Sequence, residues 1–230
     1  MQHMLSYLAL YDTTNKTSMS TILGIDEAGR GCVIGSLVVA GAKFKEEKLA
    51  QLEALGVQDS KQLTRAQREA LAPQIEALAE QTHLVILCAQ ELSENLTQVE
   101  LRAMAQIINK LEAEKVVLDM PVGPGAQRNF RQSLKKKLSY KPQELIAENK
   151  ADSKFVIVGA ASILAKVRRD ALVQELHKQY GDFGWGYPAE PKTIKFLKEW
   201  YEQHRYFPDC VRMKWKTVQT LLQVQTAFEF

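Results

Sequence analysis

The sequence predicts an α/β fold, with a layered domain of strands and helices and a C-terminal helical subdomain. Apolar runs alternate with helical patterns through residues 21–180, which is typical of strands interleaved with helices. After Tyr180 the pattern is mainly helical. No internal repeat or flexible linker is present, so we expect an N-terminal extension over 1–20, an α/β domain over 21–180 and the helical subdomain over 181–230.

Five apolar segments are predicted to be strands. They are Ile22–Ile25, Val33–Ala42, His83–Ala89, Lys115–Asp119 and Glu144–Ala147. The fourth ends where Pro121 and Gly123 follow, because proline cannot donate to a strand ladder. The glycines near residue 30 allow the turn between the first two strands.

Helices are predicted between these strands and after them. They cover Glu46–Leu55, Arg65–Glu80, Thr97–Glu114, Asn129–Leu138 and Val158–Tyr180. Gly56 ends the first of these helices, and Thr64 is the expected N-cap of the second.

Composition narrows the class of protein. The 230 residues are 46% hydrophobic and 25% charged with a net charge of +3, as in ordinary globular proteins, and compatible with a nucleic-acid partner. No apolar run reaches the roughly 18 residues of a membrane span, and the first twenty residues lack the pattern of a secretory signal. The three cysteines are widely spaced, which favours a reducing, cytoplasmic location over a disulfide or zinc framework.

Acidic residues follow or precede the predicted elements at related positions. Asp26 and Glu27 end the first strand beside Gly29–Gly31, Asp119 ends a second strand, and Asp152 precedes the long last helix of the α/β domain. Strand ends that share one sheet edge bring such side chains together, where they repel unless metal ions neutralise them. Hard oxygen ligands suit Mg²⁺ or Mn²⁺. The set therefore favours two-metal phosphodiester hydrolysis.

Each acid alone has a plainer explanation. Asp26 and Glu27 can be solvated acids at a strand end, and Asp119 can be a simple strand-terminating acid. Asp152 can be an acid favoured by a helix N-terminus. The hypothesis depends on the set of four.

Longer motifs make the chain resemble a known family. The motifs are GIDEAGRG at Gly24–Gly31, DSKQLT at Asp59–Thr64, NKAD at Asn149–Asp152, AASILAKVRRD at Ala160–Asp170 and GYPAEP at Gly186–Pro191. In this order they resemble type 2 ribonuclease H (ribonuclease HII), and the likeness extends from Leu23 to Thr217. The loop around Tyr187 looks more like the archaeal and eukaryotic form.

The resemblance implies an endoribonuclease with a ribonuclease H-like fold, in which a mixed central β-sheet is flanked by helices. It implies that Asp26, Glu27, Asp119 and Asp152 bind two divalent ions, Mg²⁺ or Mn²⁺, and catalyse hydrolysis. The expected substrates are RNA–DNA hybrids and duplex DNA with embedded ribonucleotides, cut on the 5′ side of the ribonucleotide to leave 3′-hydroxyl and 5′-phosphate ends.

The resemblance also implies the substrate-binding residues. Gly29, Arg30 and Gly31 would read the ribose 2′-hydroxyl, and Tyr187 would sense the junction with DNA. Two plainer readings stay open: Arg30 paired with Glu27 on the surface, and Tyr187 packed on the core.

Residue chemistry adds further substrate contacts. Lys61 lies in a loop as a candidate phosphate contact, and Ser162 and Lys166 share a helix face that can meet the backbone.

The chain departs from the family at two positions, where Cys32 and Ser36 replace prolines. Neither position supplies a metal ligand in the family. Cys32 is expected to pack, and it regains a backbone donor that proline lacks.

Two other functions remain open for this sequence. One is a non-catalytic protein that binds RNA–DNA hybrids. The other is a different nuclease of the same fold, such as a junction resolvase. The tail after Gln223 loosely resembles a sliding-clamp-binding peptide, and a monomer is expected.

Overall fold

The computed structural model describes residues 20–57 and 62–226, and in it five strands form one mixed sheet in the order β3-β2-β1-β4-β5. The strands are β1 (Thr21–Ala28), β2 (Leu37–Lys45), β3 (Gln81–Leu87), β4 (Lys115–Asp119) and β5 (Glu144–Glu148). β1, β2 and β3 pair antiparallel, whereas β4 and β5 extend the sheet from β1 in parallel. The carboxyl ends of β1, β4 and β5 therefore share one edge.

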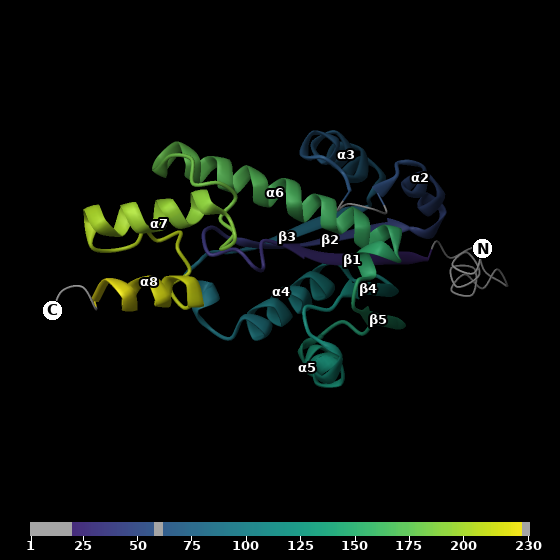
Figure 1. The fold of residues 1–230 in the computed structure, drawn as a ribbon. Helices are drawn as coiled ribbons and strands as arrows, with labels where there is room; N and C mark the ends of the chain where they lie inside the picture. Colours follow the sequence, from purple (N-terminus) through teal and green to yellow (C-terminus); the bar gives the residue numbers. More distant parts are fainter. Residues whose placement is uncertain (1–19, 58–61, 227–230) are drawn as a thin grey trace.

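Helices cover both faces of the sheet (Figure 1). One face packs on α4 (Leu96–Leu111) and α5 (Gln127–Lys137), and the other packs on α2 (Leu49–Ala54), α3 (Arg65–Leu78) and α6 (Val156–Tyr180). Side chains along β1 alternate between the two cores, as strand geometry requires.

β1 and α6 lie in direct contact at Gly24. A Cβ added there would stand 2.1 Å from the carbonyl oxygen of Ile157, a distance that no side chain can accept. Glycine at this position lets the start of α6 sit beside the strand that carries Asp26 and Glu27.

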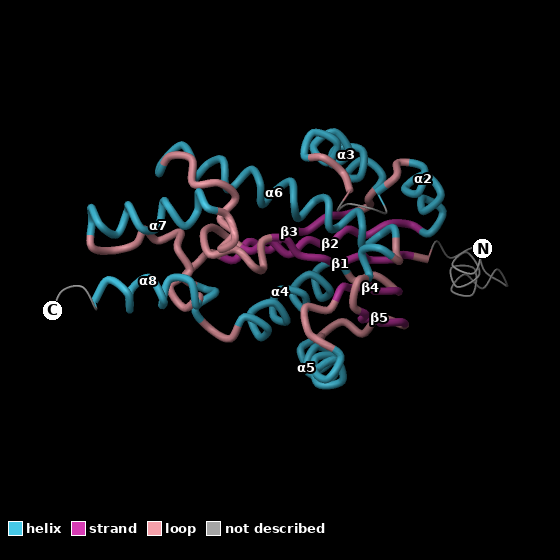
Figure 2. The backbone as a smooth tube through the Cα atoms, in the orientation of Figure 1, coloured by secondary structure: helices cyan, strands magenta, loops and turns pink. Residues whose placement is uncertain are grey.

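A third core joins the C-terminal helices to the rest. α7 (Pro191–His204) and α8 (Lys216–Thr226) pack with the second half of α6, and Val33 and Ile34 from the β1–β2 connection enter this core. Figure 2 shows the loops gathered between the sheet and these helices. The third core therefore includes residues on both sides of the boundary expected at residue 180.

Most predicted elements are present with shifted ends, but the second strand starts later than expected. β2 begins at Leu37, whereas Val33 was predicted. Gly35 has a φ of 91°, and the N–H groups of Val33 and Gly35 donate to Gly186 and Cys210. The backbone before Leu37 is therefore bound to the C-terminal part of the chain instead of to β3.

Short 3₁₀ turns connect several elements, at η1 (Glu46–Lys48), η3 (Glu91–Ser93), η4 (Pro124–Ala126) and η5 (Ala151–Ser153). Thr64 forms the expected N-cap of α3, as part of a capping box with Gln67. Over the described ranges, no helix has the length and apolar character that a membrane crossing needs.

Candidate metal and nucleic-acid site

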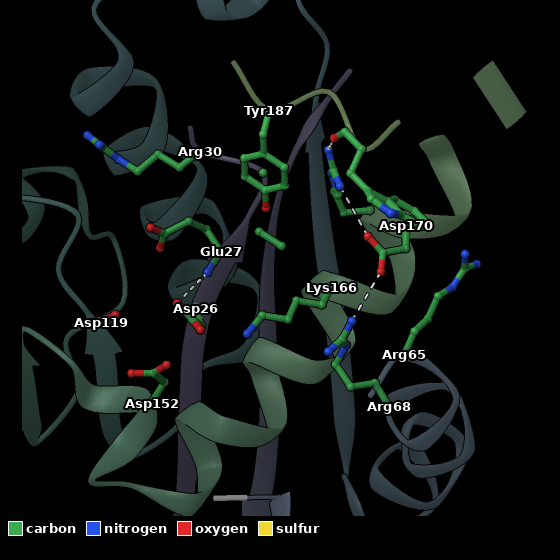
Figure 3. Close-up of a pocket in the computed structure, with 14 residues that line it drawn as sticks. Asp26, Glu27, Arg30, Arg65, Arg68, Asp119, Asp152, Lys166, Asp170 and Tyr187 are labelled. Carbon is green, nitrogen blue, oxygen red and sulfur yellow. Dashed lines mark hydrogen bonds and ion pairs between the residues drawn. The ribbon is translucent and has the colours of Figure 1, made fainter. Parts of the chain in front are cut away.

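A cavity of about 580 Å³ opens at the carboxyl edge of β1 and β4 (Figure 3). All four predicted acids line it, although they come from three separate stretches of chain. The lining residues are Asp26, Glu27, Ala28, Gly29, Arg30, Arg65, Arg68, Asp119, Asp152, Lys166, Arg169, Asp170, Trp185 and Tyr187.

Asp26 and Glu27 lie next to each other at the end of β1. Asp26 is buried and its Oδ1 accepts a hydrogen bond from the Glu27 N–H at 2.8 Å. Burial raises the pKa of Asp26 to about 7, although hydrogen bonds from Ser162 and the Glu27 backbone oppose the rise. Burial and the neighbouring Asp26 and Glu100 raise the pKa of Glu27 well above its usual range. Both carboxyls therefore favour a positive partner.

Asp119 and Asp152 complete the group. Asp119 ends β4, and its Oδ1 accepts a hydrogen bond from the Ala151 N–H at 3.2 Å. Asp152 is buried in η5, directly before α6. Asn149 fixes this region, because its Nδ2 donates to the carbonyls of Met120 and Val122. The NKAD segment thus connects the loop after β4 to the loop after β5.

The donor set fits divalent metal ions. Four carboxylates line one cavity, and Glu27 Oε2 is buried with no hydrogen-bond donor among the described residues. Within those residues, no three acidic, histidine or cysteine side chains converge closely enough to hold one ion in their present positions. To hold one ion, these side chains would have to rotate toward a common point.

Arg30 reaches an acid that sequence reasoning missed. Its Nε lies 2.8 Å from Oε1 of Glu100, a fully buried carboxylate on α4. The alternative of an Arg30 pair with Glu27 is therefore wrong. Burial raises the pKa of Glu100 to about 7, against the opposing effect of Arg30. No motif marks Glu100, because it is an ordinary helical glutamate in the sequence.

Gly29 and Gly31 have different surroundings. Gly29 lines the cavity with a φ of 91°, and an added Cβ would stand 2.8 Å from the carbonyl oxygen of Ser36. Glycine is required there for both reasons. Gly31 is exposed and lies outside the cavity lining.

Arg212 binds the backbone of the Gly29–Gly31 turn. Sequence reasoning did not single out this residue. The residue is 1% exposed, and its guanidinium donates to the carbonyls of Gly35, Arg30 and Gly29 at 2.9, 3.0 and 2.7 Å. Burial lowers the pKa of Arg212 to about 10, so the group remains charged at neutral pH. One side chain from the C-terminal segment thus satisfies three carbonyls of the β1–β2 connection.

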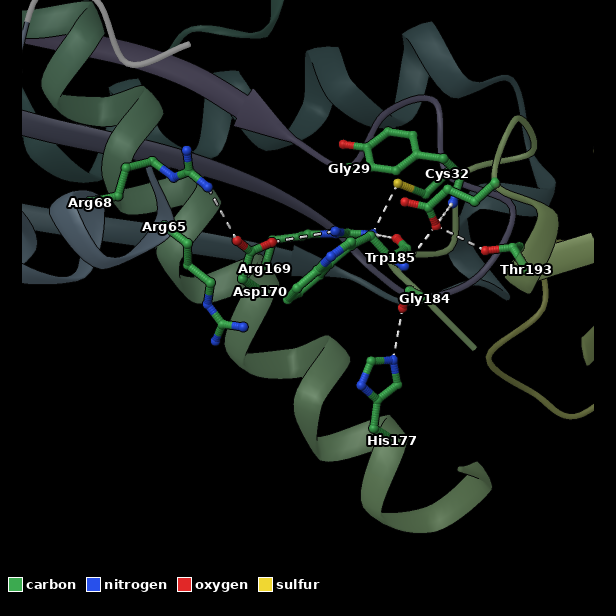
Figure 4. Close-up of polar contacts among 12 residues, drawn as sticks. Gly29, Cys32, Arg65, Arg68, Arg169, Asp170, His177, Gly184, Trp185 and Thr193 are labelled. Atoms are coloured by element: carbon green, nitrogen blue, oxygen red, sulfur yellow. Dashed lines mark hydrogen bonds and ion pairs between the residues drawn. The ribbon is translucent and has the colours of Figure 1, made fainter. Parts of the chain in front are cut away.

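Tyr187 projects at the rim of the cavity with 42% of its surface exposed, so the alternative of a core-packed tyrosine is wrong. The guanidinium of Arg169 lies 5.4 Å from its ring centroid. Arg169 also donates from Nη2 to Cys32 Sγ at 3.0 Å and to the carbonyl of Trp185 (Figure 4). Cys32 is buried, as expected, and its N–H donates to the Gly29 carbonyl at 3.3 Å.

The remaining predicted contacts differ in outcome. Lys166 lines the cavity and donates from Nζ to Ser162 Oγ at 2.7 Å. Ser162 itself is fully buried, and its expected contact with substrate stays a prediction. In this structure Ser162 accepts the Lys166 bond and hydrogen-bonds to Asp26. Lys61 lies outside the described residues, as does the end of the tail, residues 227–230.

Two arginines of α3 add positive charge that sequence reasoning did not single out. Arg65 and Arg68 both line the cavity, and Arg68 Nη2 lies 3.6 Å from Asp170 Oδ2 on α6. A basic residue in the first turns of the helix after the DSKQLT loop was the available signal.

An acid-lined cavity at the carboxyl edge of a mixed five-stranded sheet, flanked by basic side chains, defines a nuclease of the ribonuclease H-like fold. A family model described as ribonuclease HII matches residues 23–218. Ribonuclease HII of Pyrococcus furiosus is 42% identical over 201 residues, which cover 86% of this chain and 89% of that protein. The chain belongs to the ribonuclease HII family.

Solved structures agree with this assignment. The ribonuclease H2 of Pyrococcus horikoshii OT3 has a TM-score of 0.82 and 37% identity, covering 89% of this chain and 98% of that one. The ribonuclease HII in a complex with PCNA from Archaeoglobus fulgidus has a TM-score of 0.78 and 38% identity. The match covers 87% of this chain and 96% of that one. A Bst-RNase HIII structure, at 19% identity and a TM-score of 0.74, shares the fold. Together these structures confirm the predicted fold class and the likeness of this chain to archaeal relatives.

Proposed function

We propose that this protein is an endoribonuclease that hydrolyses the RNA strand of RNA–DNA hybrids and cuts on the 5′ side of ribonucleotides embedded in duplex DNA. Membership of the ribonuclease HII family supports hydrolysis of hybrids. In this proposal the products carry 3′-hydroxyl and 5′-phosphate ends, because water is the nucleophile and the 2′-hydroxyl is not.

The observation that carries the proposal is the convergence of Asp26, Glu27, Asp119 and Asp152 on one cavity. The family depends on divalent metal ions, and we propose that Mg²⁺ or Mn²⁺ is held by these four acids. Bound ions would activate water and stabilise the leaving oxygen. The raised pKa of Asp26, about 7, supports this role because metal binding compensates for the buried charge.

The surrounding residues receive complementary roles in the proposal. Arg30 and Lys166 contact phosphates, and the backbone of Gly29 and Gly31 bonds to the ribose 2′-hydroxyl, which is both donor and acceptor. Tyr187 stacks on the sugar or base that follows. Lys61 remains a proposed phosphate contact.

The decisive test compares Asp119→Asn with the wild-type protein on a duplex containing one ribonucleotide, with an all-DNA duplex as control. A neutral ligand weakens metal binding, so cleavage should fall by orders of magnitude while the melting temperature and duplex affinity change little. Near wild-type cleavage across Mg²⁺ and Mn²⁺ titrations would show that the assigned acids are wrong. Cleavage of the all-DNA duplex would favour another nuclease of this fold.

The proposal extends to a protein partner, the cellular location and the oligomeric state. A solved relative is described as a PCNA complex, which supports a sliding-clamp partner for this chain. The tail proposed to bind it extends beyond the described residues, so deletion of Thr226–Phe230 with measurement of clamp affinity is the test. The three cysteines are free thiols, which supports a cytoplasmic location, and we propose a monomer with the three-segment organisation given above.

A further inference from the structure

A second hollow of about 450 Å³ adjoins the acid-lined cavity and shares two of its lining residues, Arg65 and Trp185. It lies between the start of α3, the last turns of α6 and the loop that follows α6. Its other lining residues include Gln174, His177, Asp182 and Lys192. The two hollows are therefore adjacent, and Arg65 and Trp185 line both of them.

The pair itself is well ordered by its contacts. The Arg65 guanidinium lies 4.9 Å from the centroid of the Trp185 ring, and its Nε donates to Glu69 at 2.8 Å. The Trp185 backbone is held at both ends, because its N–H donates to Glu190 Oε2 at 2.7 Å and its carbonyl accepts from Arg169 (Figure 4). A cation and an aromatic ring are thus fixed between the two hollows.

The acids around the second hollow are committed to other partners. Asp182 pairs with Lys192 and accepts from the Gly184 N–H, while Glu190 accepts from Trp185 and from Thr193. The contact between Arg65 and Glu69 uses Nε, so both Nη groups of Arg65 remain able to donate to an anion. A phosphate meets little repulsion there and at least one cation.

We propose that the bound duplex continues from the acid-lined cavity across Arg65 and Trp185, with Arg65 contacting a backbone phosphate and Trp185 contacting a sugar or base of the flanking DNA. This inference rests on the proposed function and extends its substrate-binding surface. The same loop then carries two aromatic contacts: Tyr187 at the cleavage site and Trp185 one step farther along the strand. Trp185 affects binding of the flank and takes no part in the chemistry.

The test uses duplexes with one ribonucleotide in a fixed sequence, whose DNA is shortened stepwise on one side and then on the other. For the wild-type protein, KM should rise when one of the two flanks becomes too short to reach the second hollow. Arg65→Gln and Trp185→Ala should each raise KM on long-flank duplexes about fivefold or more, with kcat changed less, because a charged hydrogen bond to phosphate or a stacking contact each contributes about 1–3 kcal/mol. The difference in KM between each variant and the wild-type protein should shrink as that flank is shortened.

Matched controls separate this role from a structural one. Lys195→Gln removes one charge from an equivalent i,i+4 ion pair on α7, and Trp200→Ala removes a half-buried tryptophan that packs on Phe196 and His204 outside both hollows. These controls should show no dependence on flank length beyond that of wild type.

Two results overturn the inference. In the first, Arg65→Gln and Trp185→Ala match their controls at every flank length. In the second, kcat and KM change equally at all lengths together with the melting temperature, which indicates packing alone. If wild type cleaves while either result holds, only this inference fails. If wild type does not cut the duplex at all, the proposed function fails first.

Discussion

Tyr187 combines exposure with rigid support, which suits a residue that contacts the substrate beside the cut. The residue is 42% exposed, its ring lies 5.4 Å from the Arg169 guanidinium, and the adjacent Gly186 has a φ of 77° that only glycine adopts easily. Tyr187→Ala should remove one stacking contact, worth about 1–3 kcal/mol. We expect kcat/KM to fall more on a single embedded ribonucleotide than on a long RNA–DNA hybrid. The measurement is the ratio of the two kcat/KM values.

The control for this prediction is thermal stability. An exposed side chain should leave the melting temperature nearly unchanged. An unchanged ratio with a large drop in melting temperature would assign Tyr187 a structural role and leave the Gly29–Gly31 turn as the proposed reader of the ribose.

Glu100 makes stability depend on pH in a direction that can be worked out. Burial raises the pKa of this carboxyl from 4.5 to about 7, so the folded protein favours the protonated form. Its contribution to folding is complete below pH 4.5 and is lost as the pH rises to about 7. Glu100→Gln should therefore raise the free energy of unfolding relative to wild type at pH 8 but not at pH 4, by at most roughly 3 kcal/mol.

Urea unfolding at both pH values, without divalent ions, measures this difference. A matched comparison is Glu94→Gln, because Glu94 pairs with Arg102 on the surface and is 60% exposed. A Glu100→Gln variant that is destabilised equally at both pH values would show that the ion pair with Arg30 outweighs the cost of burial.

At the scale of elements, Arg212 couples the C-terminal segment to the turn between β1 and β2. All three of its hydrogen bonds, to the carbonyls of Gly29, Arg30 and Gly35, are lost when the side chain is shortened, and of these carbonyls Gly29 keeps a bond from the Cys32 N–H at 3.3 Å. Arg212→Leu should cost about 2–5 kcal/mol, because buried acceptors lose their partners. It should also reduce discrimination between a single ribonucleotide and an all-DNA duplex.

Arg212→Lys distinguishes charge from shape in this prediction. A lysine ammonium keeps the charge but lacks the planar fork that bonds to three carbonyls at once. We expect intermediate stability by urea unfolding and poor discrimination. Full recovery of both properties by lysine would contradict the role assigned to the fork.

The elements also show which features the sequence could predict. The strand ends and their acids follow from short-range pattern, because apolar runs and strand-terminating residues are local signals. The predicted start of β2 is wrong because Val33 and Ile34 are apolar for a reason other than strand formation. They belong to the third core, together with Phe183 and Val211. Glu100 and Arg212 carry no local signal either, since their partners lie far away in the chain. Ser162 shares a helix face with Lys166 as predicted, but that face points to Asp26.

At the scale of the whole molecule, the third core joins the C-terminal segment to the β1–β2 connection beside the acid-lined cavity. Val33, Ile34 and Val173 are buried against Phe183, Leu197 and Val218. The N–H groups of Val33 and Gly35 also donate to residues after α6, and Arg212 lies there too. Removing residues 182–230 would expose this apolar surface and release the turn that shapes the cavity.

We therefore predict that the full chain unfolds in one cooperative transition and that a chain ending at Gly181 does not fold cooperatively. Calorimetry of both chains tests this, with the deletion of Thr226–Phe230 as a control that removes none of the described residues of the third core. The shorter chain should also lose cleavage of hybrids, because Gly29 and Arg30 would no longer be held by Arg212. A fragment that melts near the wild-type temperature and still cleaves would show that residues 21–180 form an independent domain, with the helical subdomain as an accessory to it.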